Sequence, residues 1–432
     1  MLLIANVYLL DPAAGREGYC DILTDGERIV KIGENLYGEF VKRGETDGAK
    51  DLQVIDASGL IAAPGLVDVH SHFRDPGFAY KEDIETGAMA AAKGGYTTVV
   101  LMANTRPAVD NEDTLSYVLE KGKKTGIHIE TCATVTKGMK GKEMVDMECL
   151  HKKGAAGFTD DGVPILSAEL AEEAMREAKR LGVPISLHEE NPAYIENNGI
   201  NAGVASAYYQ IGGSQREAEI DLVKRDLEIA LKTGACMDVQ HISTKEAVAL
   251  VREAKKSGGD IHAEAAPHHF TLTEEAVMRY GTLAKMNPPL REEADRMAII
   301  EGLQDGTIDL IATDHAPHSR EEKDRPITEA PSGIIGLETA LSLGITQLVD
   351  TGFLTMMSLL KKMTCNPAKM YGLDAGYLAE GGPADIVLFD AGETWIVTDF
   401  ASKSDNSPFR GWQLKGVVKY TICGGRVVYQ NK

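Results

Sequence analysis

Two histidines, His70 and His72, stand one residue apart at the end of a short apolar run that begins at Leu66. The β-branched residues Val67 and Val69 favour a strand for this run, and on a strand residues i and i+2 point to the same face. Two imidazoles on one face at the end of a strand can begin a divalent-metal site. Because an isolated His-x-His pair also arises by chance, the rest of the chain must show whether other ligands join it.

The elements that would position these histidines repeat along the middle of the chain. Eight apolar runs alternate with amphipathic helical stretches, and the runs lie at 66–70, 97–102, 128–134, 155–159, 184–188, 236–241, 260–265 and 309–313. Strands that alternate with helices indicate a parallel sheet, and eight such units predict a closed (β/α)8, TIM-like barrel of the α/β class. A doubly wound open sheet is the alternative, but it commonly carries a glycine-rich phosphate loop after its first strand, and no such loop follows residues 66–70.

The two ends of the chain follow a different pattern. Residues 1–60 and 376–432 consist of short strand-like runs separated by turn residues, without long helical periodicity. A β segment of this size is only marginally stable alone. We therefore expect the two ends to pair as one small composite β-sandwich that flanks a barrel formed by residues 61–375.

Barrel enzymes build their active sites at the carboxyl ends of the strands, and polar side chains stand at several of these ends. They are His70, His72, Arg74, Asn104, Asp160, Asp161, His188, His241, Asp314 and His318. Four histidines with two or more carboxylates exceed what one tetrahedral zinc ion binds, and they suit two Zn2+ ions about 3.5–4 Å apart, bridged by a carboxylate and a hydroxide. Such a pair makes hydroxide available near neutral pH and polarises a carbonyl, which predicts hydrolysis of an amide-like bond, with Asp314 as the general acid/base and a further metal contact.

The composition narrows the possible functions. The chain has 432 residues and a formal net charge of −20, which argues against nucleic-acid binding because that needs a basic surface. Its six cysteines are scattered without a Cys-x-x-Cys pair, so they fit small buried residues in a reducing cytoplasm better than disulfides or a thiolate zinc site. The start of the chain lacks the features of a signal peptide, and no run reaches transmembrane length, so we expect a cytoplasmic protein with no membrane partner.

Further motifs give the pattern a family resemblance. One ordered set reads His70-x-His72-x-Arg74, Asp161, His188, His241 and Asp314, and five motifs accompany it: Met102-Ala-Asn104-Thr-Arg-Pro107, Phe158-Thr-Asp-Asp161-Gly162, Asn287-Pro-Pro-Leu-Arg291, Ala312-Thr-Asp314-His-Ala-Pro-His318 and Pro331-Ser-Gly333-Ile-Ile-Gly336-Leu-Glu-Thr339. Over nearly its whole length the chain resembles the amidohydrolase superfamily, and within it the dihydroorotases of the longer, type I kind. The resemblance implies reversible interconversion of N-carbamoyl-L-aspartate and L-dihydroorotate in pyrimidine synthesis.

Carried over residue by residue, the resemblance also implies roles for the site. One zinc ion would be bound by His70 and His72 and the other by His188 and His241, with Asp161 as the bridge and Asp314 as the acid/base. The substrate would be held by Arg74, Asn104 and His318 at its carboxylate, by Asn287 at its ring and by the main chain near Gly333. Asp160 stays the alternative bridge, because many dimetal relatives use a carboxylated lysine where this sequence offers two adjacent aspartates.

Arg74 bears on which cyclic amide is the substrate. An arginine two residues past the metal histidines can hold a carboxylate through two parallel hydrogen bonds, whereas hydantoinase-like relatives act on uncharged rings. A surface ion pair with Asp75 or Glu82 is the alternative for this side chain.

Two other readings of the chain stay open. It could be another cyclic amidase, such as an allantoinase or hydantoinase, or a catalytically silent dihydroorotase-like subunit. The resemblance also allows a homodimer or a complex with aspartate transcarbamoylase. The long charged segment 317–333, which carries His318, is either a solvated loop or a mobile segment that closes over the substrate.

Overall fold

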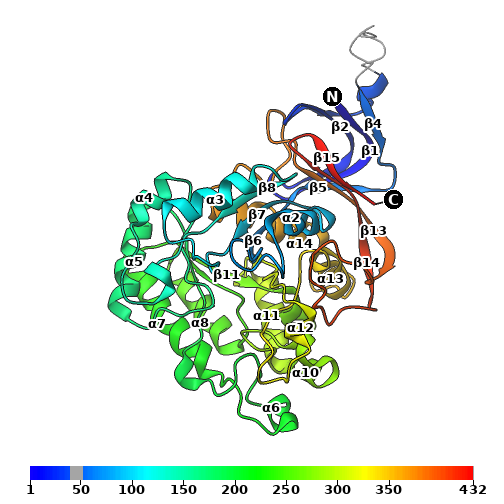
Figure 1. The fold of residues 1–432 in the computed structure, drawn as a ribbon. Helices are drawn as coiled ribbons and strands as arrows, with labels where there is room; N and C mark the ends of the chain where they lie inside the picture. The colour runs from blue at the N-terminus through cyan, green and yellow to red at the C-terminus, as the bar shows by residue number, and fades with distance from the viewer. Residues whose placement is uncertain (39–51, 432) are drawn as a thin grey trace.

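The computed structural model describes residues 1–38 and 52–431, and its central unit is a barrel (Figure 1). Seven parallel strands form its wall: β6 (Leu66–Ser71), β7 (Tyr96–Leu101), β8 (His128–Thr131), β9 (Ile185–Leu187), β10 (Met237–Val239), β11 (Ile261–Ala265) and β12 (Leu310–Ile311). Single bridges join β8 to β9 through Phe158 and close the ring between Ser71 and His315. The predicted (β/α)8 barrel is therefore confirmed, although the expected strand at 155–159 is reduced to bridges at Phe158.

Helices cover the outside of this wall, and Figure 1 shows α4, α5, α7 and α8 along one side of it. The longer helices are α2 (Ile84–Lys93), α3 (Glu112–Gly122), α5 (Ala168–Leu181), α7 (Glu217–Thr233), α8 (Lys245–Lys256), α11 (Glu293–Asp305) and α14 (Met356–Met363). Shorter ones are α4 (Met147–Lys152), α6 (Val204–Tyr209), α9 (Pro267–Thr271), α10 (Glu275–Tyr280), α12 (Arg320–Lys323), α13 (Ala340–Gly344) and α15 (Cys365–Met370).

Helix α5 illustrates how the sequence sets these elements. The Ser167 hydroxyl accepts a hydrogen bond from the Leu170 amide at its first turn, and Gly182 ends the helix with a φ of 73°, a left-handed conformation that glycine adopts without strain. The buried face consists mostly of alanines, which let the helix lie close to the barrel: Ala171, Ala174 and Ala178.

The two ends of the chain meet in one sheet beside the barrel (Figure 1). Its strands are β1 (Leu2–Asp11), β2 (Arg16–Asp25), β3 (Arg28–Gly33), β4 (Gln53–Asp56), β5 (Ile61–Pro64), β13 (Ile386–Ile396), β14 (Gln413–Cys423) and β15 (Arg426–Gln430). They pair in the order β15-β14-β13-β5-β1-β2-β3, with β4 beside β1. The expected pairing of the two ends is thus confirmed, and their strands are hydrogen-bonded into one continuous sheet.

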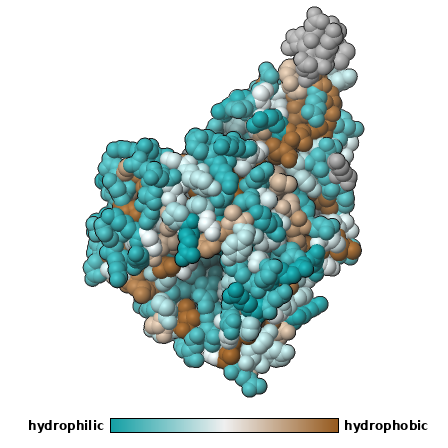
Figure 2. Space-filling model, viewed as in Figure 1, coloured by the Kyte–Doolittle hydropathy of each residue, from teal (hydrophilic) through white to brown (hydrophobic). Residues whose placement is uncertain are grey.

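This flanking sheet has its own apolar core, to which both ends of the chain contribute. Buried side chains of β1 and β2 pack there with side chains of β13 and β14, among them Ile4, Ile22, Leu388 and Ile422. Residues 39–51 of the expected 1–60 segment lie outside the described residues, and the boundaries near residues 60 and 376 stay a prediction. No helix among the described residues is long and apolar enough to cross a membrane. Figure 2 shows a largely hydrophilic face, with hydrophobic side chains gathered over part of the flanking sheet.

Candidate metal centre and substrate cavity

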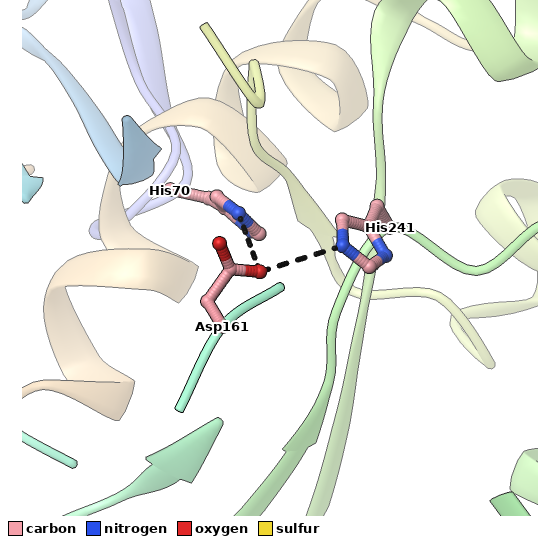
Figure 3. Close-up of side chains that lie close together, drawn as sticks. All are labelled: His70, Asp161 and His241. Atoms are coloured by element: carbon pink, nitrogen blue, oxygen red, sulfur yellow. Dashed lines mark ion pairs between the residues drawn. The ribbon is translucent and has the colours of Figure 1, made fainter. Parts of the chain in front are cut away.

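The site lies at the carboxyl ends of the barrel strands. His70 is the second-last residue of the fully buried strand β6, His188 follows β9 directly, and His241 lies just past β10. Asp161 follows the bridge at Phe158, and Asp314 follows β12. Figure 3 shows His70, Asp161 and His241, which come from three separate parts of the wall, pointing toward one another. Barrel closure therefore brings these sequence-distant side chains together.

Asp161 is central to this cluster. Its Oδ1 atom lies 3.4 Å from Nε2 of His70 and 3.6 Å from both Nδ1 of His188 and Nε2 of His241. Its Oδ2 atom lies 3.5 Å from Nε2 of His72. One carboxylate thus faces all four histidines that the sequence nominated.

The neighbouring Asp160 points elsewhere. Its Oδ1 atom accepts hydrogen bonds from the backbone amides of Val135 at 2.8 Å and Thr136 at 3.1 Å, and its Oδ2 atom accepts one from the Thr136 hydroxyl. These bonds fix the loop after β8. Of the two adjacent aspartates, the structure therefore directs Asp161 to the histidines and Asp160 to the backbone.

Asp314 forms the second carboxylate of the cluster. Its Oδ1 atom lies 3.1 Å from Nε2 of His72 and 3.6 Å from Nε2 of His70. Its backbone has a φ of 44°, a left-handed conformation uncommon for residues other than glycine, asparagine and aspartate. This turn directs the side chain back over the end of β6.

The donor atoms fit divalent cations. Two overlapping sets, His70 with Asp161 and His241, and His70 with His72 and Asp314, each place their ligand atoms within 4.8 Å of one another. Within the described part of the chain, the buried Nε2 atom of His70 and Nδ1 atom of His241 have no hydrogen-bond partner. Burial alone would lower the pKa of His70, yet nearby carboxylates raise it well above its usual value. Histidine nitrogens together with carboxylate oxygens are the donors typical of zinc sites.

The histidines are oriented by their second ring nitrogens. Nδ1 of His70 lies 2.8 Å from Oε2 of Glu264, a buried residue of β11, and Nδ1 of His72 lies 3.0 Å from Oδ1 of Asn104. Such partners fix the imidazole plane and tautomer of a metal ligand. The sequence reasoning missed Glu264, although a lone glutamate inside the apolar run 261–265 could have pointed to it.

A cavity of about 440 Å3 opens above this cluster. Its lining includes nine of the nominated residues: His72, Arg74, Asn104, Asp161, His188, His241, Asn287, Asp314 and His318. His70 lies buried beneath them, and Gly333 follows the lining residue Ser332. The far wall of the cavity is formed by Thr328, Ala330, Pro331 and Ser332, within the charged segment 317–333.

Arg74 makes neither of the ion pairs considered as alternatives. Asp75 pairs instead with Lys121 and Tyr117, and Glu82 accepts a hydrogen bond from Ser402. The Arg74 Nε atom donates to the carbonyl oxygen of Pro317 at 3.2 Å, and burial lowers the pKa of its guanidinium. No carboxylate within the described residues forms an ion pair with this side chain. A cationic side chain thus lines the cavity without a carboxylate partner among the described residues.

His318 stands beside this arginine. Its Nε2 atom lies 3.5 Å from Nη2 of Arg74, and its Nδ1 atom lies 3.1 Å from Nζ of Lys81. Burial, together with these neighbouring cations, lowers the pKa of His318 to about 3. The imidazole is therefore neutral at physiological pH.

The other nominated groups stand close to the cluster. The Asn104 amide donates to Oδ2 of Asp161 at 3.2 Å, and the Asn287 amide nitrogen lies 3.2 Å from Nε2 of His188. His315, next to Asp314, points away from the site, since its Nδ1 atom accepts a hydrogen bond from the Gly336 amide. The substrate contacts assigned to Asn104, Asn287 and Gly333 stay predictions.

Comparisons with known proteins agree with this geometry. Residues 61–428 match the model of the Amidohydrolase family. A curated dihydroorotase of Clostridioides difficile (strain 630) is 55% identical over 99% of this chain and 100% of its own length. A dihydroorotase of Clostridium acetobutylicum is 51% identical over 100% of both chains.

Solved structures of the same architecture are more distant in sequence. The L-hydantoinase (dihydropyrimidinase) of Arthrobacter aurescens superposes with a TM-score of 0.85 at 25% identity, over 99% of this chain and 96% of that one. The dihydropyrimidinase of Brevibacillus agri NCHU1002 superposes with a TM-score of 0.84 at 24% identity, over 100% and 95%. The latter likeness concerns the fold alone.

Proposed function

Because this chain belongs to the amidohydrolase family, we propose that it is a dihydroorotase, which interconverts N-carbamoyl-L-aspartate and L-dihydroorotate. One observation carries this conclusion. A chain 55% identical over its full length to a dihydroorotase directs Arg74, without a carboxylate partner among the described residues, into the cavity above a histidine–carboxylate cluster. The hydantoinase-like alternative is not favoured, since the L-hydantoinase of Arthrobacter aurescens is 25% identical to this chain.

The donor set suits two divalent cations, for which we assign Zn2+. We assign six residues as ligands: His70, His72, Asp161, His188, His241 and Asp314. When bound, such cations polarise the ring amide carbonyl and make a neighbouring water more acidic. The ligand set is complete, which argues against a catalytically silent subunit.

Asp314 is the group to which we assign proton transfer. Its carboxylate lines the cavity and is held by His72 at 3.1 Å. In hydrolysis it accepts the proton from water as the new C–O bond forms at the ring carbonyl carbon. It returns that proton to the ring nitrogen as the C–N bond breaks. Ring closure runs through the same two transfers in reverse.

Arg74 binds the carboxylate that the ring carries. A guanidinium can donate two parallel hydrogen bonds to a carboxylate, and the neutral Nε2 side of His318 lies next to it. We assign Asn104 to the same carboxylate, Asn287 to the ring amide and the main chain at Gly333 to the ring edge. An uncharged hydantoin would leave the buried guanidinium unpaired, so the site discriminates by charge.

Compartment and assembly follow from the same proposal. The six cysteines are all free thiols in the structure, which fits a reducing cytoplasm. For partners we propose a homodimer or a complex with an aspartate transcarbamoylase, and size-exclusion chromatography with light scattering tests the first of these.

The activity is tested by turnover of L-dihydroorotate before and after chelation, and again after zinc is added back. We expect activity to disappear with the chelator and to return with zinc. Turnover of hydantoin or allantoin in place of dihydroorotate would overturn the substrate assignment. Bound metal without any turnover would favour a silent subunit.

A further inference from the structure

One wall of the cavity is held by two buried lysines. Nζ of Lys285 donates to the carbonyl oxygens of Ile327 and Ala330, each at 2.7 Å. Nζ of Lys323 donates to the carbonyl oxygens of Pro331 at 2.9 Å and Gly333 at 3.1 Å. The residues that line the cavity from this side are 328 and 330–332. Two of the four carbonyls belong to lining residues, Ala330 and Pro331, and the other two, of Ile327 and Gly333, lie directly before and after them. Two buried lysine Nζ atoms thus donate hydrogen bonds along the length of this wall.

Burial of these two lysine side chains costs free energy. Lys285 is 4% exposed and Lys323 is 3% exposed, and neither forms an ion pair with a carboxylate within the described residues. Burial lowers the pKa of both side chains, that of Lys323 to about 7. A buried charge without a counter-ion destabilises a fold unless hydrogen bonds compensate. The carbonyls of the wall supply those bonds.

Few other hydrogen bonds connect the wall to the barrel. Within the segment, the amides of Glu329 and Ala330 donate to the carbonyl of Pro326 and form a turn. At its end the Gly333 amide donates to the carbonyl of Lys285, and the Gly333 carbonyl accepts from Asn406 as well as from Lys323. Between these points the described hydrogen bonds of the wall to other parts of the chain are the lysine bonds and a bond from Ser332 to Asn198. The Ile327 side chain also packs against the barrel core, and Ala330 is buried.

We propose that Lys285 and Lys323 are positioning residues that hold the segment 327–333 against the substrate cavity, so that they govern substrate affinity and leave the chemical step unchanged. The proposal rests on the proposed function only in naming the occupant of the cavity. The holding of the wall is a property of the protein without substrate. Lys323 is the more informative of the two because it does not line the cavity, whereas Lys285 does.

Lys323→Met tests this proposal, with Lys362→Met as the matched control. Lys362 is also buried and also donates to one backbone carbonyl, that of Ile308 at 2.8 Å, but it lies on α14 outside the cavity lining. In the protein without substrate, we expect amide hydrogen exchange in 327–333 to speed up at least about tenfold in Lys323→Met and to stay unchanged in Lys362→Met. Equal exchange in this segment for wild type and Lys323→Met would overturn the proposal, whether or not the enzyme turns over dihydroorotate.

The kinetic arm uses L-dihydroorotate as the probe. We expect Lys323→Met to raise KM at least about tenfold with kcat changed less than about twofold, because an unheld wall must be ordered when substrate binds. Should Lys323→Met fail to fold, Lys285→Met gives the same comparison at the edge of the cavity. A KM rise in Lys285→Met but none in a folded Lys323→Met would mean that Lys285 touches the substrate directly, and it would refute the shared role.

Discussion

Nδ1 of His70 lies 2.8 Å from Oε2 of Glu264, although the two residues are 194 positions apart in the chain. His70 is the second-last residue of β6 and Glu264 lies on β11, so the contact crosses the inside of the barrel and leaves Nε2 of His70 directed at Asp161 and Asp314. The barrel interior therefore fixes the orientation of the most buried proposed ligand.

Replacement of Glu264 should weaken metal binding. In Glu264→Gln the negative charge that holds the Nδ1 proton of His70 is lost, and we expect metal affinity to fall about 10- to 100-fold. Competition with a chromogenic chelator measures this affinity directly. Glu130→Gln is the control, since Glu130 is a half-buried glutamate of β8 away from the cavity lining. Equal affinity in wild type and Glu264→Gln would show that the contact does not support the metal.

Substitution of the two adjacent aspartates, Asp160 and Asp161, should have different effects on metal content and on stability. Asp161→Asn removes the carboxylate that faces four histidines, and we expect bound metal and activity to fall together. Asp160→Asn should keep its metal but lower the free energy of unfolding by about 1–3 kcal/mol, because buried amide donors of Val135 and Thr136 lose a charged acceptor. Elemental analysis and urea unfolding of both variants test this pair. Loss of metal in Asp160→Asn with retention in Asp161→Asn would reverse the assignment.

Arg74→Ala should raise the KM for dihydroorotate about 10- to 100-fold, because a charge-assisted pair with the substrate carboxylate is lost. Arg74→Lys should recover only part of this affinity, since an ammonium cannot match a carboxylate with two parallel bonds. Steady-state kinetics on both variants provide the measurement, with the exposed Arg106→Ala as control. An unchanged KM in Arg74→Ala would show that this residue does not bind the substrate carboxylate.

The junction between barrel and flanking sheet should respond to pH through His128. Its Nε2 atom lies 3.0 Å from Oδ2 of Asp385, and this hydrogen bond is the largest cause that raises the pKa of His128 to about 11. A histidine whose folded pKa is raised stabilises the fold fully below its unfolded value, and this contribution is lost as pH rises through the folded value. The pair joins β8 to the residue just before β13.

We therefore expect His128→Gln to lower the free energy of unfolding by about 1 kcal/mol near pH 6, a small value because the side chain is 49% exposed and solvent screens the pair. The difference from wild type should shrink as the pH rises toward 11. Urea unfolding at about pH 6 and about pH 9 measures it. His151→Gln, at a half-buried histidine without a carboxylate partner among the described residues, is the control. A difference that grows with pH would contradict the assignment.

Local patterns in the sequence determined the architecture and most of the metal cluster. Strand periodicity places His70 and His72 on one face, and the alternation of strands with helices requires a barrel whose strand ends meet on one rim. The same rule predicts that His188, His241 and Asp314 meet on this rim. The pairing of the two chain ends followed from the same reasoning about which strands could not be stable alone.

Tertiary structure decided what depends on contacts between distant segments. Whether Asp160 or Asp161 faces the histidines was settled by where the amides of Val135 and Thr136 lie. The fourth predicted strand shrank to bridges at Phe158 because its neighbours β8 and β9 pair with it only there. The apolar run around Glu264 marks that residue as unusual, but the sequence does not reveal that its partner is His70. Lys285 and Lys323 likewise carry no local signature that reveals the carbonyls they bind. A side-chain period fixes the face on which a residue lies, whereas the atom that it meets is fixed only when the closed barrel and its loops are packed.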